Sequence, residues 1–176
     1  EVAIVRRLSH PNIVKVLDAG LDARGTLFIA FELLQGRSLE AEIEARGGLT
    51  IARATSLSMQ VLAALEVAHA AGIVHRDLKP ANVFLTGEIG EFAKLLDFGI
   101  AKSTHPNSFQ GLTQHGTMLG TPAYMAPEQL FGKEVGPASD LFAFGIVMAE
   151  MILGRPLYGS DVSPISILQE RIKQGR

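Results

Sequence analysis

The chain has 176 residues, of which 47% are hydrophobic and 19% charged, and its formal net charge is -2. These values predict one soluble globular domain with a hydrophobic core of its own, and the charge offers no positive field that would attract nucleic acid or an anionic membrane. Because the sequence has no cysteine, a disulfide scaffold, a thiol nucleophile and a thiolate metal site are excluded.

The first part of the chain predicts a helix end, a β hairpin and a short helix. Apolar residues recur at helical spacing over residues 2–8 and stop before a proline. Two β-rich runs, 13–17 and 26–33, are separated by a Gly/Asp-containing turn, which is typical of a hairpin. Residues 35–36 form a break that we expect to act as a hinge, and Ser38 is a suitable N-cap for an acidic helix that begins near Leu39.

The rest of the chain predicts mainly helices. Thr50 is placed to cap a long core helix, whose apolar residues form one stripe and which ends at Gly72. The helix predicted at residues 139–153 is apolar nearly all round, and we therefore expect it to be buried. The elements expected after Gly72 are two short strands, an aperiodic loop, two helices and a polar helical segment, at residues 83–85, 93–96, 103–116, 127–130, 139–153 and 165–173.

No segment of the sequence predicts export or insertion into a membrane. The longest strongly apolar run, residues 141–153, is too short to cross a bilayer and contains Glu150. The first residues lack the layout of a signal peptide. We therefore expect this chain to act in the cytoplasm, although a longer protein could be anchored in a membrane with this part on the cytoplasmic side.

Residues 75–82, which read HRDLKPAN, combine three groups that phosphoryl transfer requires. These groups are a carboxylate that orients the attacking hydroxyl, a cation beside the moving phosphoryl group, and an oxygen ligand for magnesium. Asp77, Lys79 and Asn82 supply them within one loop. Asp97 follows fifteen residues later in the triplet DFG, directly after an apolar predicted strand.

The chain resembles the catalytic domain of protein kinases in four motifs that occur in order. They are HRDLKPAN, DFG, GTP at 120–122 and APE at 126–128. Lys79, two residues after Asp77, resembles the choice of serine/threonine kinases, and the run GTPAYMAPEQ is similar to the serine/threonine kinases of bacteria. The resemblance implies a bilobal α+β fold, ATP and Mg²⁺ as cofactors, and proteins with Ser or Thr hydroxyls as substrates. Residues 1–34 would then be a remnant of the small lobe, and residues 35–176 an incomplete large lobe.

The resemblance also assigns a role to individual residues. Asp77, Lys79 and Asn82 would be catalytic, and Asn82 and Asp97 would hold the metal. Phe31 would be the gatekeeper of the nucleotide pocket, and Thr121 would lie in the substrate loop. ATP would contact Glu1, Glu32, Leu34, Asn82, Phe84 and Asp97, and the structural residues would be His75, Phe98, Gly99, Glu128 and Asp140.

Several of these roles have simpler alternatives. Phe84 is about equally consistent with plain core packing, and a lone buried histidine such as His75 is more often structural than catalytic. Arg76 precedes the catalytic aspartate, an arrangement found in kinases that are activated by phosphorylation. Arg76 and Lys102 would bind a phosphate on Thr117, or on Thr113 as a second site, and the alternative is that Thr117 is a solvated loop residue.

The alignment of the motifs places Glu1 on the helix glutamate that pairs with a lysine of the kinase small lobe. No GxGxxG phosphate loop occurs in the chain. We therefore expect this chain alone to be a poor catalyst, and a non-catalytic binding module derived from a kinase remains an alternative. The DNA upstream of Glu1 would discriminate between the two.

Overall fold

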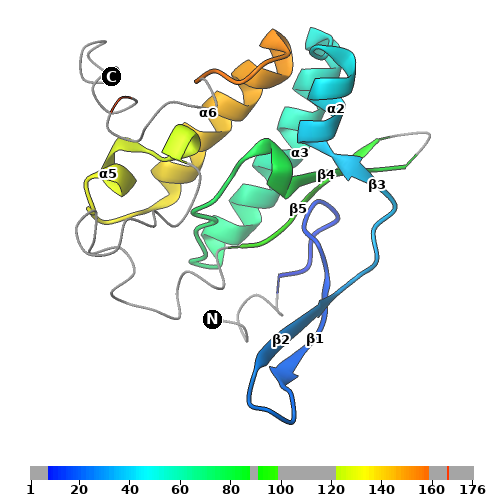
Figure 1. Ribbon diagram of the computed structural model, residues 1–176, viewed down its shortest axis with the longest axis vertical. Helices are drawn as coiled ribbons and strands as arrows, with labels where there is room; N and C mark the ends of the chain where they lie inside the picture. Colours follow the sequence, from blue (N-terminus) through cyan, green and yellow to red (C-terminus); the bar gives the residue numbers. More distant parts are fainter. Residues whose placement is uncertain (1–7, 88–90, 99–121, 159–165, 167–176) are drawn as a thin grey trace.

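The computed structural model describes residues 8–87, 91–98, 122–158 and 166 (Figure 1). A hairpin formed by β1 (Val16–Leu21) and β2 (Leu27–Phe31) extends away from a body made of helices and a small sheet (Figure 1). The described residues therefore form a mixed α and β architecture in which one hairpin projects from a mainly helical part.

The hairpin was predicted correctly, but its first strand begins later than we expected. Residues 13–17 were predicted as the strand, whereas β1 pairs with β2 from Val16 opposite Phe31 to Leu21 opposite Leu27. The turn is short because the Asp22 carboxylate accepts hydrogen bonds from the backbone N–H groups of Arg24 and Thr26, both at 2.8 Å. Local hydrogen bonding by this aspartate moves the turn to residues 22–25.

A second sheet has the strand order β3-β4-β5 and is antiparallel throughout. Its strands are β3 (Gly36–Ser38), β4 (Val83–Thr86) and β5 (Phe92–Leu95). The last two were predicted to within one residue, but β3 was not, because Gly36 was interpreted as part of a break. A Cβ atom at Gly36 would lie 1.9 Å from the carbonyl oxygen of Leu85, so glycine allows β3 to approach β4 this closely.

We expect Gly36→Ala to lower the free energy of unfolding by about 1–3 kcal/mol or more, since the new methyl group must displace backbone rather than a side chain. Chemical denaturation would measure the loss. Gly25→Ala is the matched control, because Gly25 also has a positive φ (78°) but no atom within 4 Å of a Cβ placed there. Equal losses in the two variants would contradict the steric explanation.

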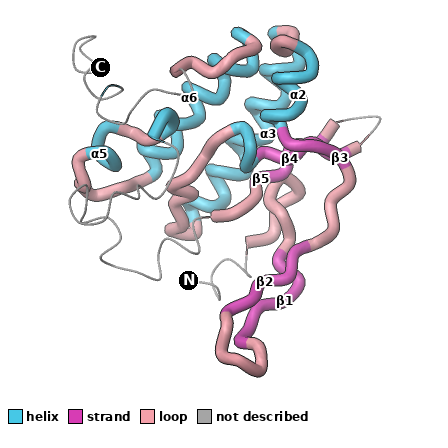
Figure 2. Tube along the Cα trace, in the orientation of Figure 1, coloured by secondary structure: helices cyan, strands magenta, loops and turns pink. Residues whose placement is uncertain are grey.

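In the described part of the chain the helices are α2 (Leu39–Arg46), α3 (Ile51–Ala70), α5 (Pro127–Leu130) and α6 (Pro137–Leu153), and Figure 2 shows how they lie together. Both predicted caps are confirmed: Ser38 accepts from the N–H of Ala41, and Thr50 from that of Arg53. Glycine in the left-handed conformation ends α2 at Gly47. The boundaries of the helices were therefore largely encoded by local capping chemistry.

The hydrophobic core lies between α3, α6 and the strands β4 and β5. All four elements supply fully buried side chains, namely Leu57, Val61, Leu65, Val83, Leu95, Val147 and Met151, and Leu39 of α2 and Leu78 join the same core. The expectation that the 139–153 helix is buried all round is wrong for one face of α6, where Leu141, Met148 and Ile152 are exposed. Burial of α6 is one-sided here because α3 and the turn Pro122–Tyr124 pack on the opposite face.

A buried carboxylate ties α2 to its neighbours. Glu42 is 0% exposed and pairs with Arg37 of β3, Arg46 of α2 and Arg53 of α3. Burial alone would raise the pKa of Glu42, but hydrogen bonds and charge from these arginines outweigh it and leave the pKa below its usual value. Arg53 also binds Glu91, which lies just before β5. This cluster was not anticipated from the sequence.

None of the helices in the described part of the chain is both long and apolar enough to cross a membrane.

Candidate active site

The Asp140 carboxylate binds the backbone at the start of the HRDLKPAN loop. It is 1% exposed, and its Oδ2 accepts hydrogen bonds from the His75 backbone N–H at 2.8 Å and from His69 Nε2 at 2.7 Å. Its Oδ1 accepts from the Arg76 backbone N–H at 2.8 Å. The loop therefore begins on a fixed carboxylate supplied by a helix 64 residues away in the sequence.

His75 is fully buried and connects this loop to the segment that carries Asp97. Its Nε2 is 2.8 Å from the carbonyl oxygen of Leu96, and its Nδ1 accepts from the N–H of Asp77 at 3.3 Å. The ring also packs on Phe98, with 4.8 Å between the centroids. Burial lowers the pKa of His75, although the charges of Asp140, Asp77 and Asp97 oppose this shift. The neutral tautomer with the proton on Nε2 satisfies both contacts.

Because burial lowers the pKa of His75 in the fold, we expect stability to fall as the pH falls below about 6.5, where the unfolded chain binds a proton more readily than the folded chain does. Between pH 7.5 and 5.5 the loss is at most about 1.4 kcal/mol, the value for a histidine that binds no proton in the folded state. Urea titrations across this range would measure it.

The matched variant is His75→Gln, in which this part of the pH dependence should disappear. Burial raises the pKa of Glu150, which acts with the opposite sign, but Glu150 is present in both proteins and cancels in the difference. Identical pH dependence in the two proteins would rule out His75 as the titrating group.

Asp77, Lys79 and Asn82 lie within contact of one another. Lys79 Nζ is 3.4 Å from Asp77 Oδ2. The Asn82 amide nitrogen donates to the Asp77 backbone oxygen at 2.8 Å and to Asp77 Oδ2 at 3.2 Å. Because its nitrogen is used in this way, Asn82 has its carbonyl oxygen Oδ1 to offer to a cation. The short 3₁₀ turn Pro80–Asn82 gives the loop its shape.

A backbone hydrogen bond of Leu96 positions Asp97 beside the Asp77–Asn82 loop. The Leu96 N–H donates to the carbonyl oxygen of Asn82 at 2.9 Å, so the Asp97 segment runs directly beside the Asn82 loop. Both segments contain a non-glycine residue with a left-handed backbone, Arg76 at φ 65° and Asp97 at φ 49°. Such strain is concentrated at functional sites, where the surrounding contacts hold it.

The donor atoms suit a magnesium ion that is bound together with phosphate. Among the described residues, no group of three or more His, Cys, Asp or Glu side chains forms a metal site. Mg²⁺ does not require one, since it keeps several waters and is usually held by one or two protein oxygens together with phosphate oxygens. Asp97 and Asn82 can supply those two oxygens.

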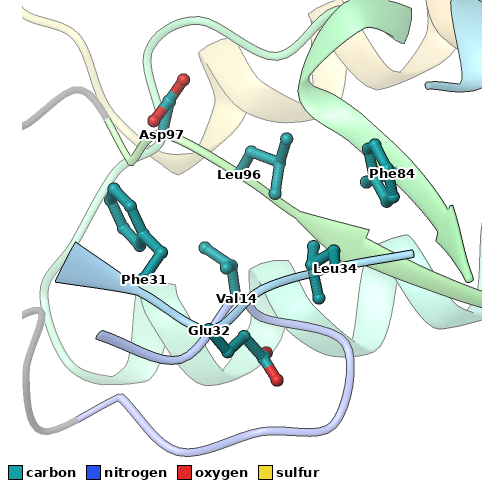
Figure 3. A pocket seen from close by; sticks show the side chains of 7 residues that line it. All are labelled: Val14, Phe31, Glu32, Leu34, Phe84, Leu96 and Asp97. Carbon is teal, nitrogen blue, oxygen red and sulfur yellow. The ribbon is translucent and has the colours of Figure 1, made fainter. Parts of the chain in front are cut away.

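A pocket of about 240 Å³ adjoins Asp97 (Figure 3). Figure 3 shows Asp97 and Phe31 at one end and Leu34 and Phe84 at the other. Five residues expected at the nucleotide site therefore line one cavity, namely Phe31, Glu32, Leu34, Phe84 and Asp97. Val14 and Leu96 also line it and were missed from the sequence, although Leu96 directly precedes the DFG motif.

The Glu32 side chain is occupied by the protein itself. Its Oε1 accepts from Lys94 Nζ at 2.7 Å and from the Lys15 backbone N–H at 3.0 Å. The hydrogen bond from Lys94 is the main cause that keeps the pKa of Glu32 below its usual value. A ligand in the pocket would therefore not meet a free carboxylate at Glu32.

Comparison with known proteins identifies the family. The protein kinase domain family matches residues 1–174 of the chain. The chain belongs to the protein kinase family. The expected α+β kinase fold is confirmed by the Mycobacterium tuberculosis PknI kinase domain, whose crystal structure superimposes with a TM-score of 0.71 at 28% sequence identity, over 89% of this chain and 56% of that one.

Curated relatives with similar sequences are serine/threonine-protein kinases. PknD of Mycobacterium tuberculosis is 43% identical over 155 residues, which cover 88% of this chain and 22% of PknD. The kinase pkn3 of Myxococcus xanthus is 41% identical over 164 residues, which cover 92% of this chain and 30% of the relative. The chain thus spans less than a third of the length of these two kinases.

Not every residue assigned from the kinase resemblance can be placed. Phe98 packs on His75, and Glu128 accepts a hydrogen bond from the Ser139 hydroxyl. The remaining assigned residues lie outside the described ones, namely Glu1, Gly99, Lys102, Thr113, Thr117 and Thr121.

Proposed function

We propose that this chain is the catalytic part of an ATP- and Mg²⁺-dependent protein kinase that phosphorylates Ser or Thr hydroxyls of protein substrates. The observation that carries the proposal is the contact between two loops, in which His75, Asn82 and Leu96 join the Asp77 segment to Asp97 beside an apolar cavity. Because ATP is plentiful inside cells, we further propose a cytoplasmic site of action.

Each group has a distinct task in this proposal. Asp77 orients the substrate hydroxyl and accepts its proton, and Lys79, 3.4 Å from Asp77, places positive charge beside the transferred group. Asn82 and Asp97 would hold the magnesium, which neutralises the phosphate charge when bound. The apolar end of the pocket, near Phe84 and Leu34, suits an adenine ring, since cofactor pockets are mainly apolar with a few placed polar groups.

The proposed division of the chain follows the same geometry. The pocket takes Val14 and Phe31 from the hairpin side and Phe84 and Leu96 from the other sheet, with Leu34 between them. We therefore propose that residues 1–34 belong to a small lobe and residues 35–176 to a large lobe.

Transfer of the γ-phosphoryl group from labelled ATP to a mixed library of Ser- and Thr-containing peptides tests the function, using the full-length protein. We expect transfer that requires Mg²⁺ and that is lost in Asp97→Ala. Nucleotide binding without any transfer would instead support the alternative of a non-catalytic binding module.

We also propose that phosphorylation of Thr117 activates the protein, because Arg76 directly precedes Asp77 and a phosphate brings about 1.5–2 negative charges that Arg76 and Lys102 can bind. We expect Thr117→Ala to reduce activity, and Thr113→Ala to do so less. Mass spectrometry of the active protein would detect the modification. An unmodified Thr117 in fully active protein would remove this proposal.

A further inference from the structure

Strand β5 lies at the edge of its sheet, yet its outer backbone groups are all used in the described structure. β4 pairs with one side of β5 from Phe92 to Leu95. On the other side a bare edge would leave N–H and C=O groups open, which is costly in a buried strand. The atoms that satisfy this edge come from two segments far away in the sequence.

Two side-chain amides occupy the middle of that edge. The Ala93 N–H donates to Gln60 Oε1 at 2.9 Å, and Gln60 Nε2 donates to the carbonyl oxygen of Glu91 at 3.1 Å. Asn12 Nδ2 donates to the Ala93 carbonyl oxygen at 2.8 Å and to Gln60 Oε1 at 2.9 Å. Gln60 thus binds residues 91 and 93 as a neighbouring strand would.

The backbone of the Asn12 segment continues this pattern toward the site. The Leu95 N–H donates to the Asn12 carbonyl oxygen at 2.8 Å, and the Val14 N–H donates to the Leu95 carbonyl oxygen at 2.9 Å. Together, Asn12, Val14 and Gln60 replace a fourth strand. Asp97 follows Leu95 by only two residues, so the register of β5 determines where its carboxylate lies.

We propose that Gln60, which lies on α3 and does not line the nucleotide pocket, is a positioning residue for Asp97. It acts through β5: its amide holds residues 91 and 93, which fixes the strand against β4 and presents Asp97 beside Asn82. Register matters because a shift of one residue moves a strand by about 3.3 Å and turns its side chains to the opposite face. The link to Asp97 rests on the proposed role of that residue in magnesium binding.

Three variants of α3 separate this role from general stability. Gln60→Met keeps the length of the side chain but removes both hydrogen-bonding groups. Gln60→Glu keeps an acceptor for the Ala93 N–H, but it replaces the donor to Glu91 with a carboxylate oxygen and adds a negative charge. Ser56→Met places the same new side chain at an exposed position of the same helix and serves as the control.

The first measurement is amide hydrogen exchange in the full chain. We expect Gln60→Met to speed exchange of the Ala93 amide about tenfold relative to the Val61 amide of α3, because one hydrogen bond that protects Ala93 is lost. Gln60→Glu should have a smaller effect and Ser56→Met none. Equal acceleration at Ala93 and Val61, or no acceleration, would overturn the proposal, since a merely structural loss affects both.

The second measurement is the Mg²⁺ concentration that half-saturates binding of a fluorescent ADP analogue. We expect it to rise about tenfold or more in Gln60→Met, because groups that orient a metal ligand typically change metal affinity by about 10- to 100-fold. If Asp97→Ala changes the Mg²⁺ dependence but Gln60→Met does not, the positioning role is wrong. If Asp97→Ala itself has no effect, the proposed function fails and the link to Asp97 fails with it, while the exchange data still decide whether Gln60 holds β5.

Discussion

Asp77→Asn is expected to lower phosphoryl transfer by the full-length protein about 10²- to 10⁴-fold, the range that a general base contributes. The asparagine keeps the shape of the side chain but cannot accept the substrate proton. Asp77 is partly exposed, at 21%, and its side chain contacts Lys79 and Asn82. Because asparagine has the same shape, the substitution should hardly change the fold. Single-turnover kinetics at saturating ATP and Mg²⁺ would measure the effect on chemistry alone.

The control for this experiment is Glu134→Gln, which removes the same charge from an exposed residue in the described part of the chain. It should transfer phosphate at the parent rate, and both variants should unfold at the parent temperature. Full activity in Asp77→Asn would remove Asp77 from the mechanism.

Asp140→Ala is expected to destabilise the protein by about 3–5 kcal/mol, because the buried carboxylate satisfies several donors at once and its removal leaves them without an acceptor. The groups affected are the backbone N–H groups of His75 and Arg76 and the ring of His69. Since the His75–Asn82 loop begins on these bonds, activity should fall even at temperatures where the variant remains folded. Chemical denaturation and transfer assays below the melting temperature would measure the two effects separately.

Asp140→Asn sharpens the test. Asparagine can accept with its single carbonyl oxygen, but its amino group then faces a donor, so we expect a loss smaller than that of alanine. A loss in Asp140→Ala no larger than about 0.5 kcal/mol, the usual range for surface changes, would contradict the bracing role.

The residues that meet at the site were predictable where short motifs carry them. Asp77, Lys79 and Asn82 come from one loop, and DFG follows a short strand, so each chemical group is fixed by local sequence. Helix ends were also predictable, since Ser38 and Thr50 act on backbone groups three residues away. Such signals need no knowledge of the rest of the fold.

Contacts between distant segments could not be read in this way. Gln60 is one polar residue on a helix, and nothing near it in the sequence indicates that it binds β5 33 residues later. Glu42 resembles any charged residue of an acidic helix until three arginines from different elements surround it. The pairing of β3 with β4 was hidden for the same reason, because Gly36 is explained only by the Leu85 carbonyl oxygen that it approaches.

The left-handed backbone at Arg76 and Asp97 has a consequence for how these positions tolerate variation. L-residues with a branched Cβ fit this conformation poorly, whereas glycine and asparagine accept it readily. Selection at residues 76 and 97 therefore acts on the main chain as well as on the charge of the side chain. A library of substitutions sorted only for folded protein, with no measurement of catalysis, would already be depleted of valine and isoleucine at these two positions. The depletion at these two positions would thereby identify both loops of the site from the requirement for folding alone.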